Sequence, residues 1–351
     1  MKERGAVVVI LSSNFTQRGS PAIIDKFKRS EIAIKAGADL VIELPFLFAC
    51  SAGQDFARGG IDLIAKTGLA DSITFGMEDI NFPVESLVSE IINHPQEYSA
   101  LLKNELAKGA SFSKANSIAL EKIFPGSHEF ISRPNNLLAL SYIMNIKKNN
   151  YPLQIIKFER TGSYSSKIIR EDLRKNFDMI PEFAQKILES CNLCDESKLW
   201  PLLQNIFIRS QPQDLRKIYA IDEGIENLFL RNWYKAKSLD DFIGRCVCAR
   251  YTRSHIRRRL IYILLNLDKW RVTGALRVGV PYARVLAFNS IGREILHERK
   301  KFSRIKIITR LKDSESLTGK FFALTEHKAS QLYNLLNNSD MLLSHRVLQF
   351  K

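Results

Sequence analysis

A β-α-β pattern between Ala6 and Pro45 constrains the fold of this 351-residue chain more than any other feature of its sequence. The apolar run from Ala6 to Leu11 has the β-branched composition of a buried parallel strand. A polar loop from Ser12 to Pro21 follows, then an amphipathic helix that ends at Gly37 and a second strand from Asp39 to Leu44. Because a helix of this length joins parallel strands, we expect the loop at the carboxyl edge of a sheet, where such folds bind ligands.

Two more strands and a group of helices follow this unit. The runs from Asp71 to Gly76 and from Leu153 to Phe158 have the length and composition of strands. Ser51 is expected to cap a helix that ends at Gly68. Further helices have start signals near Pro83, Pro95, Ser113 and Pro134.

Gly76, Asn135 and Asn136 each have a structural and a functional interpretation. Gly76 ends a strand without a side chain, so it either permits a turn or lets a nucleotide approach the backbone closely. Asn135 and Asn136 begin the helix after Pro134, where an Asn either caps the helix or contacts an anion at its N-terminus. The residues alone favour the cap.

The strand from Leu153 to Phe158 leads into a segment with the composition of a phosphate site. Arg160 stands at the strand end, Ser165 and Ser166 begin a helix, and Arg170 lies within it. Amides and hydroxyls at a helix start donate to phosphate oxygens, and arginines neutralise phosphate charge. A Ser-Ser helix start also occurs in proteins that bind no ligand, so an ordinary helix start is the alternative.

Beyond Arg170 the strand signal fades and the apolar spacing becomes helical, with prolines at 181, 201 and 212 between the segments. We therefore expect a boundary near residues 174–182. The predicted fold is α/β, with a Rossmann-like parallel sheet in residues 1–176 and a mostly α-helical domain in residues 177–351.

The positive charge of the chain is concentrated in its second half. The formal net charge is +15 with a pI near 9.6, and residues 241–312 hold 18 Lys plus Arg against 4 Asp plus Glu, a balance of +14. This clustering predicts a polyanionic partner such as a nucleic acid, although a solvated basic face is the alternative. Tyr251 either stacks on a base or packs in the core. The candidate contacts are Arg250, Tyr251, Arg253, Arg257, Arg258 and Arg259.

Composition also limits the compartment. No apolar run reaches the ~20 residues that span a bilayer, and the first residues lack the plan of a signal peptide, so we expect a cytoplasmic protein. The 5 cysteines fit reduced thiols there. Cys191-x-x-Cys194 and Cys246-x-Cys248 could together bind zinc, but the second pair is too closely spaced for a usual zinc knuckle, which favours ordinary thiols.

Several ordered motifs resemble the bacterial tRNA(Met) cytidine acetate ligase family, a branch of the HIGH-type nucleotidyltransferases. The resemblance runs from about Val7 to about Leu296, and Tyr164 to Arg170 resembles the phosphate loop of the wider superfamily. The matching segments are Ser13 to Ala22, Gly37 to Pro45, Phe56 to Gly59, Phe75-Gly76-x-Glu78, Pro134 to Asn136, Asp222 to Asn227, Arg250 to Thr252 and Arg284 to Asn289.

The resemblance implies an ATP-dependent ligase. Such enzymes activate acetate as acetyl-adenylate, release pyrophosphate, and acetylate N4 of the wobble cytidine of elongator tRNA(Met). The cofactor is ATP, usually with Mg²⁺, and no resident metal is implied. Gly76, Asn135 and Arg160 would contact ATP, and Ser165, Ser166 and Arg170 would lie near its phosphates, while the basic helical domain would hold the tRNA.

The sequence departs from the family at the catalytic histidines. Family members begin with a strand and an Asn-Pro-Phe-His-x-Gly-His turn, whereas Ala6 to Leu11 matches their second strand and no His precedes His94. The catalytic residues are therefore left unassigned. Either the start codon lies further upstream or the adenylation chemistry is lost, and Val7 to Leu11 is expected to be an unpaired sheet edge.

Two alternatives to the full ligase remain open from the sequence. The first is a catalytically impaired tRNA-binding homologue that keeps the basic domain. The second is a nucleotidyltransferase acting on a small cofactor precursor, which the basic second half of the chain disfavours. Binding of tRNA without ATP-dependent chemistry would distinguish the first of these from the ligase.

Overall fold

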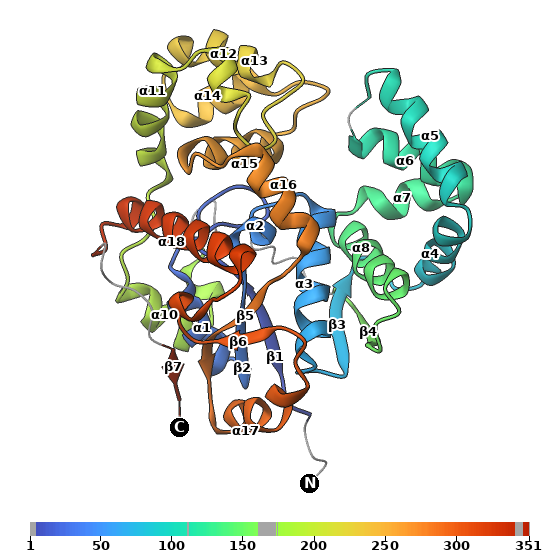
Figure 1. Ribbon diagram of the computed structural model, residues 1–351, viewed down its shortest axis with the longest axis vertical. Helices are drawn as coiled ribbons and strands as arrows, with labels where there is room; N and C mark the ends of the chain where they lie inside the picture. Colours follow the sequence, from blue (N-terminus) through green and yellow to red (C-terminus); the bar gives the residue numbers. More distant parts are fainter. Residues whose placement is uncertain (1–4, 111, 161–172, 174, 341–346, 351) are drawn as a thin grey trace.

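The computed structural model describes residues 5–110, 112–160, 173, 175–340 and 347–350, and it is a mixed α/β structure (Figure 1). One sheet has the strand order β1-β2-β5-β6, with β7 also paired to β5, and a second sheet contains β3 and β4. The strands are β1 (Val8–Ser12), β2 (Leu40–Leu44), β3 (Ser72–Met77), β4 (Gln154–Glu159), β5 (Tyr282–Phe288), β6 (Lys306–Ile308) and β7 (Leu348–Gln349).

The predicted β-α-β unit is confirmed. β1 and β2 are parallel, with Val8 opposite Leu40, and α1 (Lys26–Lys35) connects them. Asp25 caps α1 because its carboxylate accepts hydrogen bonds from the backbone N–H groups of Phe27 and Lys28. β3 and β4 are also parallel. Within the part of the chain that the structure describes, β1 pairs only with β2.

The remaining helices cover the sheets and build the second half of the chain. Those before β4 are α2 (Phe46–Ala49), α3 (Gly53–Thr67), α4 (Val84–Asn93), α5 (Pro95–Ala107), α6 (Phe112–Ile123), α7 (Ser127–Ser132) and α8 (Pro134–Lys148). Those after it are α10 (Glu182–Glu189), α11 (Leu199–Arg209), α12 (Pro212–Leu215), α13 (Ile225–Asn232), α14 (Leu239–Cys246), α15 (Arg253–Leu264), α16 (Lys269–Val278), α17 (Ser290–Arg299) and α18 (Leu317–Asn337). Short 3₁₀ turns occur at Phe177–Met179, Glu196–Lys198, Trp233–Lys235, Lys300–Phe302 and Leu311–Asp313.

One predicted helix end is confirmed, whereas two predicted N-caps are not found. Gly68 ends α3 in the left-handed conformation, with φ of 63°, as predicted. Ser51 does not cap α3, because its hydroxyl donates to the carbonyl oxygen of Phe48 and Ala52 takes the N-cap position. Asn135 and Asn136 are not caps either, since Arg133 occupies the N-cap of α8.

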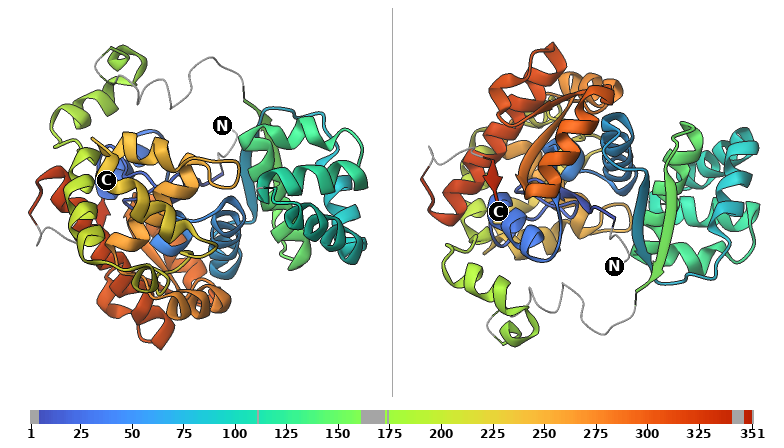
Figure 2. Two further views of the ribbon diagram at one scale, coloured as in Figure 1. Left: turned by 90° about the horizontal axis from the view of Figure 1, so that it is seen from above. Right: turned by 90° about the horizontal axis from the view of Figure 1, so that it is seen from below.

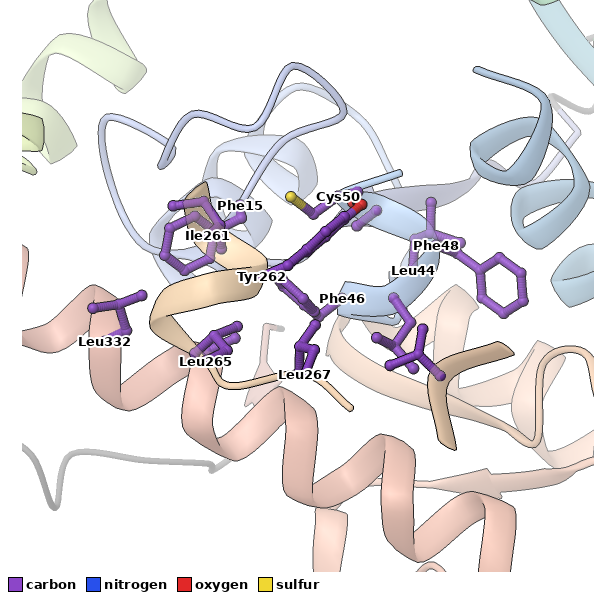
Figure 3. Close-up of a cluster of buried hydrophobic side chains, with 14 of the residues drawn as sticks. Phe15, Leu44, Phe46, Phe48, Cys50, Ile261, Tyr262, Leu265, Leu267 and Leu332 are labelled. Carbon is purple, nitrogen blue, oxygen red and sulfur yellow. Dashed lines mark hydrogen bonds between the residues drawn. The ribbon is translucent and has the colours of Figure 1, made fainter. Parts of the chain in front are cut away.

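The largest hydrophobic core joins elements from both ends of the sequence. Phe15 and Phe46 from the first fifty residues lie with Tyr262 of α15 and Leu332 of α18 in one cluster (Figure 3). The Tyr262 hydroxyl donates to the carbonyl oxygen of Cys50 at 2.5 Å. A second core fills the lobe that α4 to α8 form beside β3 and β4, which Figure 2 shows on the opposite side from α18.

The stretch after residue 177 is mostly helical, as predicted, but it also completes the first sheet. β5 is antiparallel to β2, and β6 and β7 run parallel to β5. The predicted division at residue 176 therefore does not separate all strands from all helices. Among the described residues, none of the helices combines the length and the apolar character that crossing a membrane requires.

A buried ionic cluster links the two ends of the chain inside this fold. The Lys26 ammonium on α1 lies 2.5 Å from Glu43 Oε1 on β2 and 2.7 Å from Glu326 Oε1 on α18. Arg284 of β5 stands opposite Glu43 in the sheet register and contacts Glu43 Oε2 at 3.1 Å. The other Glu326 oxygen accepts from the Phe46 N–H at 2.8 Å. None of the four charged side chains is more than 1% exposed.

This cluster predicts a decline in stability as the pH approaches neutrality. Burial and the neighbouring Glu43 carboxylate raise the pKa of Glu326 to about 7, from an ordinary value of 4.5, although Lys26 opposes the shift. Burial also disfavours the Glu43 carboxylate, but Lys26 and Arg284 outweigh it and lower that pKa to about 2. Between pH 4.5 and 7 the folded state therefore holds a proton on Glu326 that the unfolded chain has lost, so stability falls as pH rises.

Glu326→Gln replaces the titrating carboxyl by an amide that does not titrate, and it therefore tests the prediction. In urea denaturation at pH 5 and pH 8, the wild type should lose more of its free energy of unfolding across this interval than the variant does. Using the difference between the two proteins cancels the contributions of other titrating groups. Equal losses in both proteins would show that Glu326 does not titrate in this range.

Candidate functional site

Segments that follow β1 and β2 contact α8, whose first turn also contacts the segment after β3. The loop after β1 carries Gln17, and a Cβ added at Gly53, the first residue of α3, would lie 3.2 Å from Gln17 Nε2 and 3.8 Å from Leu138 Cδ2 of α8. The loop after β1, the start of the helix beyond β2 and the first turns of α8 are therefore in contact. Glu78 follows β3, and Arg160 follows β4, at the same edge of their sheet.

Gly76 and Arg160, both predicted nucleotide contacts, lie against each other. A Cβ at Gly76 would stand 2.7 Å from Arg160 Cγ and 2.8 Å from Phe158 Cε2, so only glycine leaves room for the Arg160 side chain to cross β3 here. The Arg160 N–H donates to the carbonyl oxygen of Met77 at 2.8 Å and fixes its backbone at the strand end. The Arg160 side chain is exposed, which leaves a positive charge at the end of β4.

Gly76→Ala is expected to destabilise the protein by about 1–3 kcal/mol, because the added methyl group overlaps two side chains. Gly60→Ala is a matched control, since no atom lies within 4 Å of the position that its Cβ would occupy. An alanine inside a helix is up to about 1 kcal/mol more favourable than a glycine, so the control should be neutral or slightly stabilising. Thermal denaturation of both variants checks the prediction, and equal melting temperatures would contradict it.

Glu78 organises the first turn of α8 and positions Asn135. The Glu78 carboxylate accepts hydrogen bonds from Asn135 Nδ2 at 2.5 Å and from the Asn136 backbone N–H at 3.0 Å. In return, Asn136 Oδ1 accepts from the N–H groups of Glu78 and Asp79 at 2.8 and 3.2 Å. A carboxylate at a helix N-terminus satisfies unpaired N–H groups and complements the helix dipole, so Glu78 does the capping that the sequence assigned to the asparagines.

The structure thus brings together three of the six predicted nucleotide contacts. Gly76 and Arg160 touch, and Asn135 is tied to them through Glu78, two residues beyond Gly76. The other three, Ser165, Ser166 and Arg170, lie outside the described residues. Glu78 is a functional candidate that the sequence reasoning did not assign, although it belongs to a segment that carries the family resemblance.

The arginines of α15 hold the loop after β1. Arg258 Nη1 donates to the carbonyl oxygen of Gln17 at 2.9 Å, and Arg257 Nη1 donates to Ser20 Oγ at 3.0 Å. Arg257 also pairs with Glu196. Gly19, with φ of 78°, allows the loop backbone to lie directly on the backbone of α15. These contacts use Arg257 and Arg258 within the protein, to hold the loop after β1 against α15.

Of the other four predicted nucleic-acid contacts, two are buried and two are exposed. Tyr251 is only 6% exposed, and its hydroxyl donates to the carbonyl oxygen of Glu223, so the expected stacking surface is absent at this ring. Arg259 is buried and donates through Nε to the carbonyl oxygen of Ala220. Arg259 was expected at the surface, but the side of α15 that carries it packs into the core, and Tyr251, which precedes α15, has the core position that was its alternative. Arg250 and Arg253 are exposed and pair with Glu223 and Asp240.

The electrostatics of α15 also limit its positive charge. Burial together with Arg259 and Arg258 lowers the pKa of His255 to about 3, so this imidazole is neutral at physiological pH. Most arginine charges in this region are compensated by acidic side chains or by carbonyl oxygens. All five cysteines are free thiols, and no group of three or more His, Cys, Asp or Glu side chains suited to a metal ion occurs within the described residues.

Gly76 and Arg160 lie at the carboxyl edge of a parallel sheet, which is where α/β folds bind ligands. Residues 1–345 match the model of the HIGH nucleotidyl transferase family. The tRNA(Met) cytidine acetate ligase of Clostridium perfringens is 34% identical over 372 residues, covering 96% of this chain and 91% of that protein. The ligase of the same name from Thermoanaerobacter sp. is 34% identical over 87% of this chain and 81% of that protein.

The similarity extends to a solved structure. Thermotoga maritima TmcAL bound with alpha-thio ATP superimposes with a TM-score of 0.88 at 26% sequence identity, covering 98% of this chain and 92% of that one. The apo form of the same protein gives a TM-score of 0.87. The chain therefore belongs to the tRNA(Met) cytidine acetate ligase family, within the HIGH nucleotidyltransferases.

Proposed function

We propose that this protein is an ATP-dependent ligase that activates acetate as acetyl-adenylate and acetylates N4 of the wobble cytidine of elongator tRNA(Met). The observation that carries the proposal is the corner where Gly76, Asn135 and Arg160 meet at the carboxyl ends of β3 and β4. Membership of the family supports it, as does the likeness to a structure that contains an ATP analogue.

Each side chain in this corner has a defined part in the proposal. Gly76 leaves room for the Arg160 side chain at the proposed ATP site, and the Asn135 carboxamide, held by Glu78, presents an oxygen and an NH₂ group for polar recognition. The exposed Arg160 guanidinium neutralises phosphate charge. We extend this role to Ser165, Ser166 and Arg170, which follow Arg160 in the sequence.

The proposed chemistry needs positioning and charge stabilisation more than covalent participation by the protein. An acetate oxygen attacks the α-phosphorus of ATP, the bond to the β-phosphate oxygen breaks, and pyrophosphate leaves. The cytidine N4 amine then attacks the acetyl carbonyl, loses a proton, and AMP leaves. Cationic side chains near the α- and β-phosphates stabilise the charge that develops in the first step. Mg²⁺ is expected to arrive on the nucleotide phosphates, the usual way in which proteins take up this ion with nucleotides.

The two predicted parts of the chain would bind different substrates. We propose that residues 1–176 bind ATP and acetate, and that residues 177–351 contribute the tRNA-binding surface. The cytoplasm supplies both ATP and tRNA and is the proposed compartment. The buried contacts of α15 with the loop after β1 would transmit the position of one part to the other.

Pyrophosphate release and analysis of the RNA product test this function together. With ATP, acetate and elongator methionine tRNA, we expect pyrophosphate formation and N4-acetylcytidine in the digested RNA. The same tRNA with uridine in place of the wobble cytidine should accept no acetyl group. Salt-sensitive tRNA binding without any nucleotide-dependent reaction would overturn the ligase assignment and favour a tRNA-binding homologue.

A further inference from the structure

The exposed faces of α16 and α18 lie next to each other. The Arg271 guanidinium of α16 stands over the Phe321 ring of α18, with 5.3 Å between the guanidinium carbon and the ring centroid. Figure 1 shows α16 and α18 close to each other near the middle of the view. We call the surface formed by Trp270, Gly274, Arg277, Lys320 and Lys328 the α16–α18 face.

This face carries positive charge that the protein does not compensate. The only acidic residue within the two helices is Glu326, which is fully buried. Arg277, Lys320 and Lys328 are exposed, and none of them forms an ion pair with a described acidic side chain. Lys269, at the start of α16, is paired with Asp222. The arginines of α15 differ, because their charges are largely consumed by Glu196, Asp240 and carbonyl oxygens.

Trp270 gives the same face an unusual aromatic surface. Its side chain is 81% exposed, which is rare for so large an apolar group. Gly274 follows one turn later on the same stripe, and no atom lies within 4 Å of the position its Cβ would take. Arg277 comes two turns after Trp270. Along one strand of RNA, the Trp270 ring could stack on a base and the Arg277 guanidinium could contact a phosphate. The open space at Gly274 leaves room for the sugar between them.

α16 is also bonded to α3, a helix that begins near the candidate nucleotide site. Arg58 of α3 donates through Nη1 to the carbonyl oxygen of Leu276 in α16 at 3.0 Å. The first residue of α3, Gly53, contacts Gln17 and Leu138 at the corner that contains the candidate site.

We infer that the α16–α18 face is the surface on which RNA docks, with Trp270 stacking on a base and Arg277, Lys320 and Lys328 neutralising phosphates. This inference rests on the proposed function for the identity of the RNA as tRNA. It moves the docking surface away from the α15 arginines, whose side chains hold the protein's own loops.

Charge reversal tests the electrostatic part of the inference. The triple variant Arg277→Glu, Lys320→Glu and Lys328→Glu should bind elongator methionine tRNA at least ~10-fold more weakly, with a less negative slope of log affinity against log salt. Its affinity for ATP should stay that of the wild type. Lys103→Glu, on the exposed surface of α5 in the other lobe, is the matched control and should bind tRNA normally.

Fluorescence tests the stacking part independently of any folding defect. Trp200 is 8% exposed and Trp233 is half-buried, so Trp270 is the tryptophan that a docked base can reach. Adding tRNA to the wild type should quench its emission, and Trp270→Phe should lose that response while keeping a stacking ring. Trp270→Ala should weaken binding about 10-fold. Wild-type affinity in both the triple variant and Trp270→Ala would overturn the inference, whereas failure of the wild type to bind tRNA would overturn the proposed function instead.

Discussion

Replacing Lys26 by methionine is expected to lower the free energy of unfolding by about 3–5 kcal/mol. Methionine preserves much of the side-chain volume but removes the ammonium group that lies 2.5 Å from Glu43 and 2.7 Å from Glu326, so the buried Glu43 carboxylate loses one of its two cationic partners. Removal of one partner from a fully buried ionic group leaves uncompensated charge in a medium of low dielectric constant, which accounts for the size of the effect. Urea denaturation at pH 7 measures it.

The same helix supplies the control for this variant. Lys28 is two residues away, its side chain is 41% exposed, and it pairs with Glu31 at 3.5 Å. Lys28→Met should therefore change stability by about 0–1 kcal/mol. Adding Glu326→Gln to Lys26→Met should restore part of the loss, because an uncharged amide at this buried position needs no cationic partner. Similar losses for Lys26→Met and Lys28→Met would show that the buried cluster does not hold the ends of the chain together.

Gly19→Ala is expected to destabilise the protein by about 2–5 kcal/mol and to displace the loop after β1. The residue has φ of 78°, and its new Cβ would stand 2.3 Å from the Arg258 nitrogen and 2.6 Å from the Arg257 carbonyl carbon. These are backbone atoms inside α15, so they cannot rotate away as a side chain would. Left-handed strain contributes about 1–2 kcal/mol, and overpacking contributes about 1–3 kcal/mol.

Gly109→Ala separates the two contributions. Gly109 has φ of 83°, similar to Gly19, but no atom lies within 4 Å of the position of its Cβ. The control should therefore show only the strain. Chemical denaturation gives the stability difference, and limited proteolysis within the loop reports its displacement. Equal destabilisation by the two variants would mean that the loop does not depend on its contact with α15.

The part of the fold that could be predicted from the sequence is the part set by local pattern. The β-α-β unit was readable because Ala6 to Leu11 is apolar throughout and Gly37 ends the helix between the strands. β5 was missed because Arg284 interrupts its apolar run. In the structure this arginine is fully buried against Glu43, a residue 241 positions earlier, and no local pattern reveals such a partner.

The residues of the candidate site could likewise be predicted where the signal is local in the sequence, and not where it depends on distant partners. Gly76 and Arg160 could be selected because each stands at the end of a predicted strand, and parallel strands end at one edge. Asn135 was selected with the wrong structural alternative, since the cap of α8 comes from Glu78, which is distant in sequence. The burial of Tyr251 and Arg259 could not be predicted, because a charge cluster shows which residues are basic but not which carbonyl oxygens and carboxylates the side chains will meet.

The affinity of the full chain for ATP, measured by titration calorimetry with wild type and Arg160→Ala, tests the central claim most directly. A guanidinium that contacts phosphate contributes enough that its loss should raise the Kd at least ~10-fold. Arg209→Ala, at the exposed end of α11, should leave the Kd unchanged. A wild-type Kd in Arg160→Ala would contradict a nucleotide site at the corner of Gly76, Asn135 and Arg160.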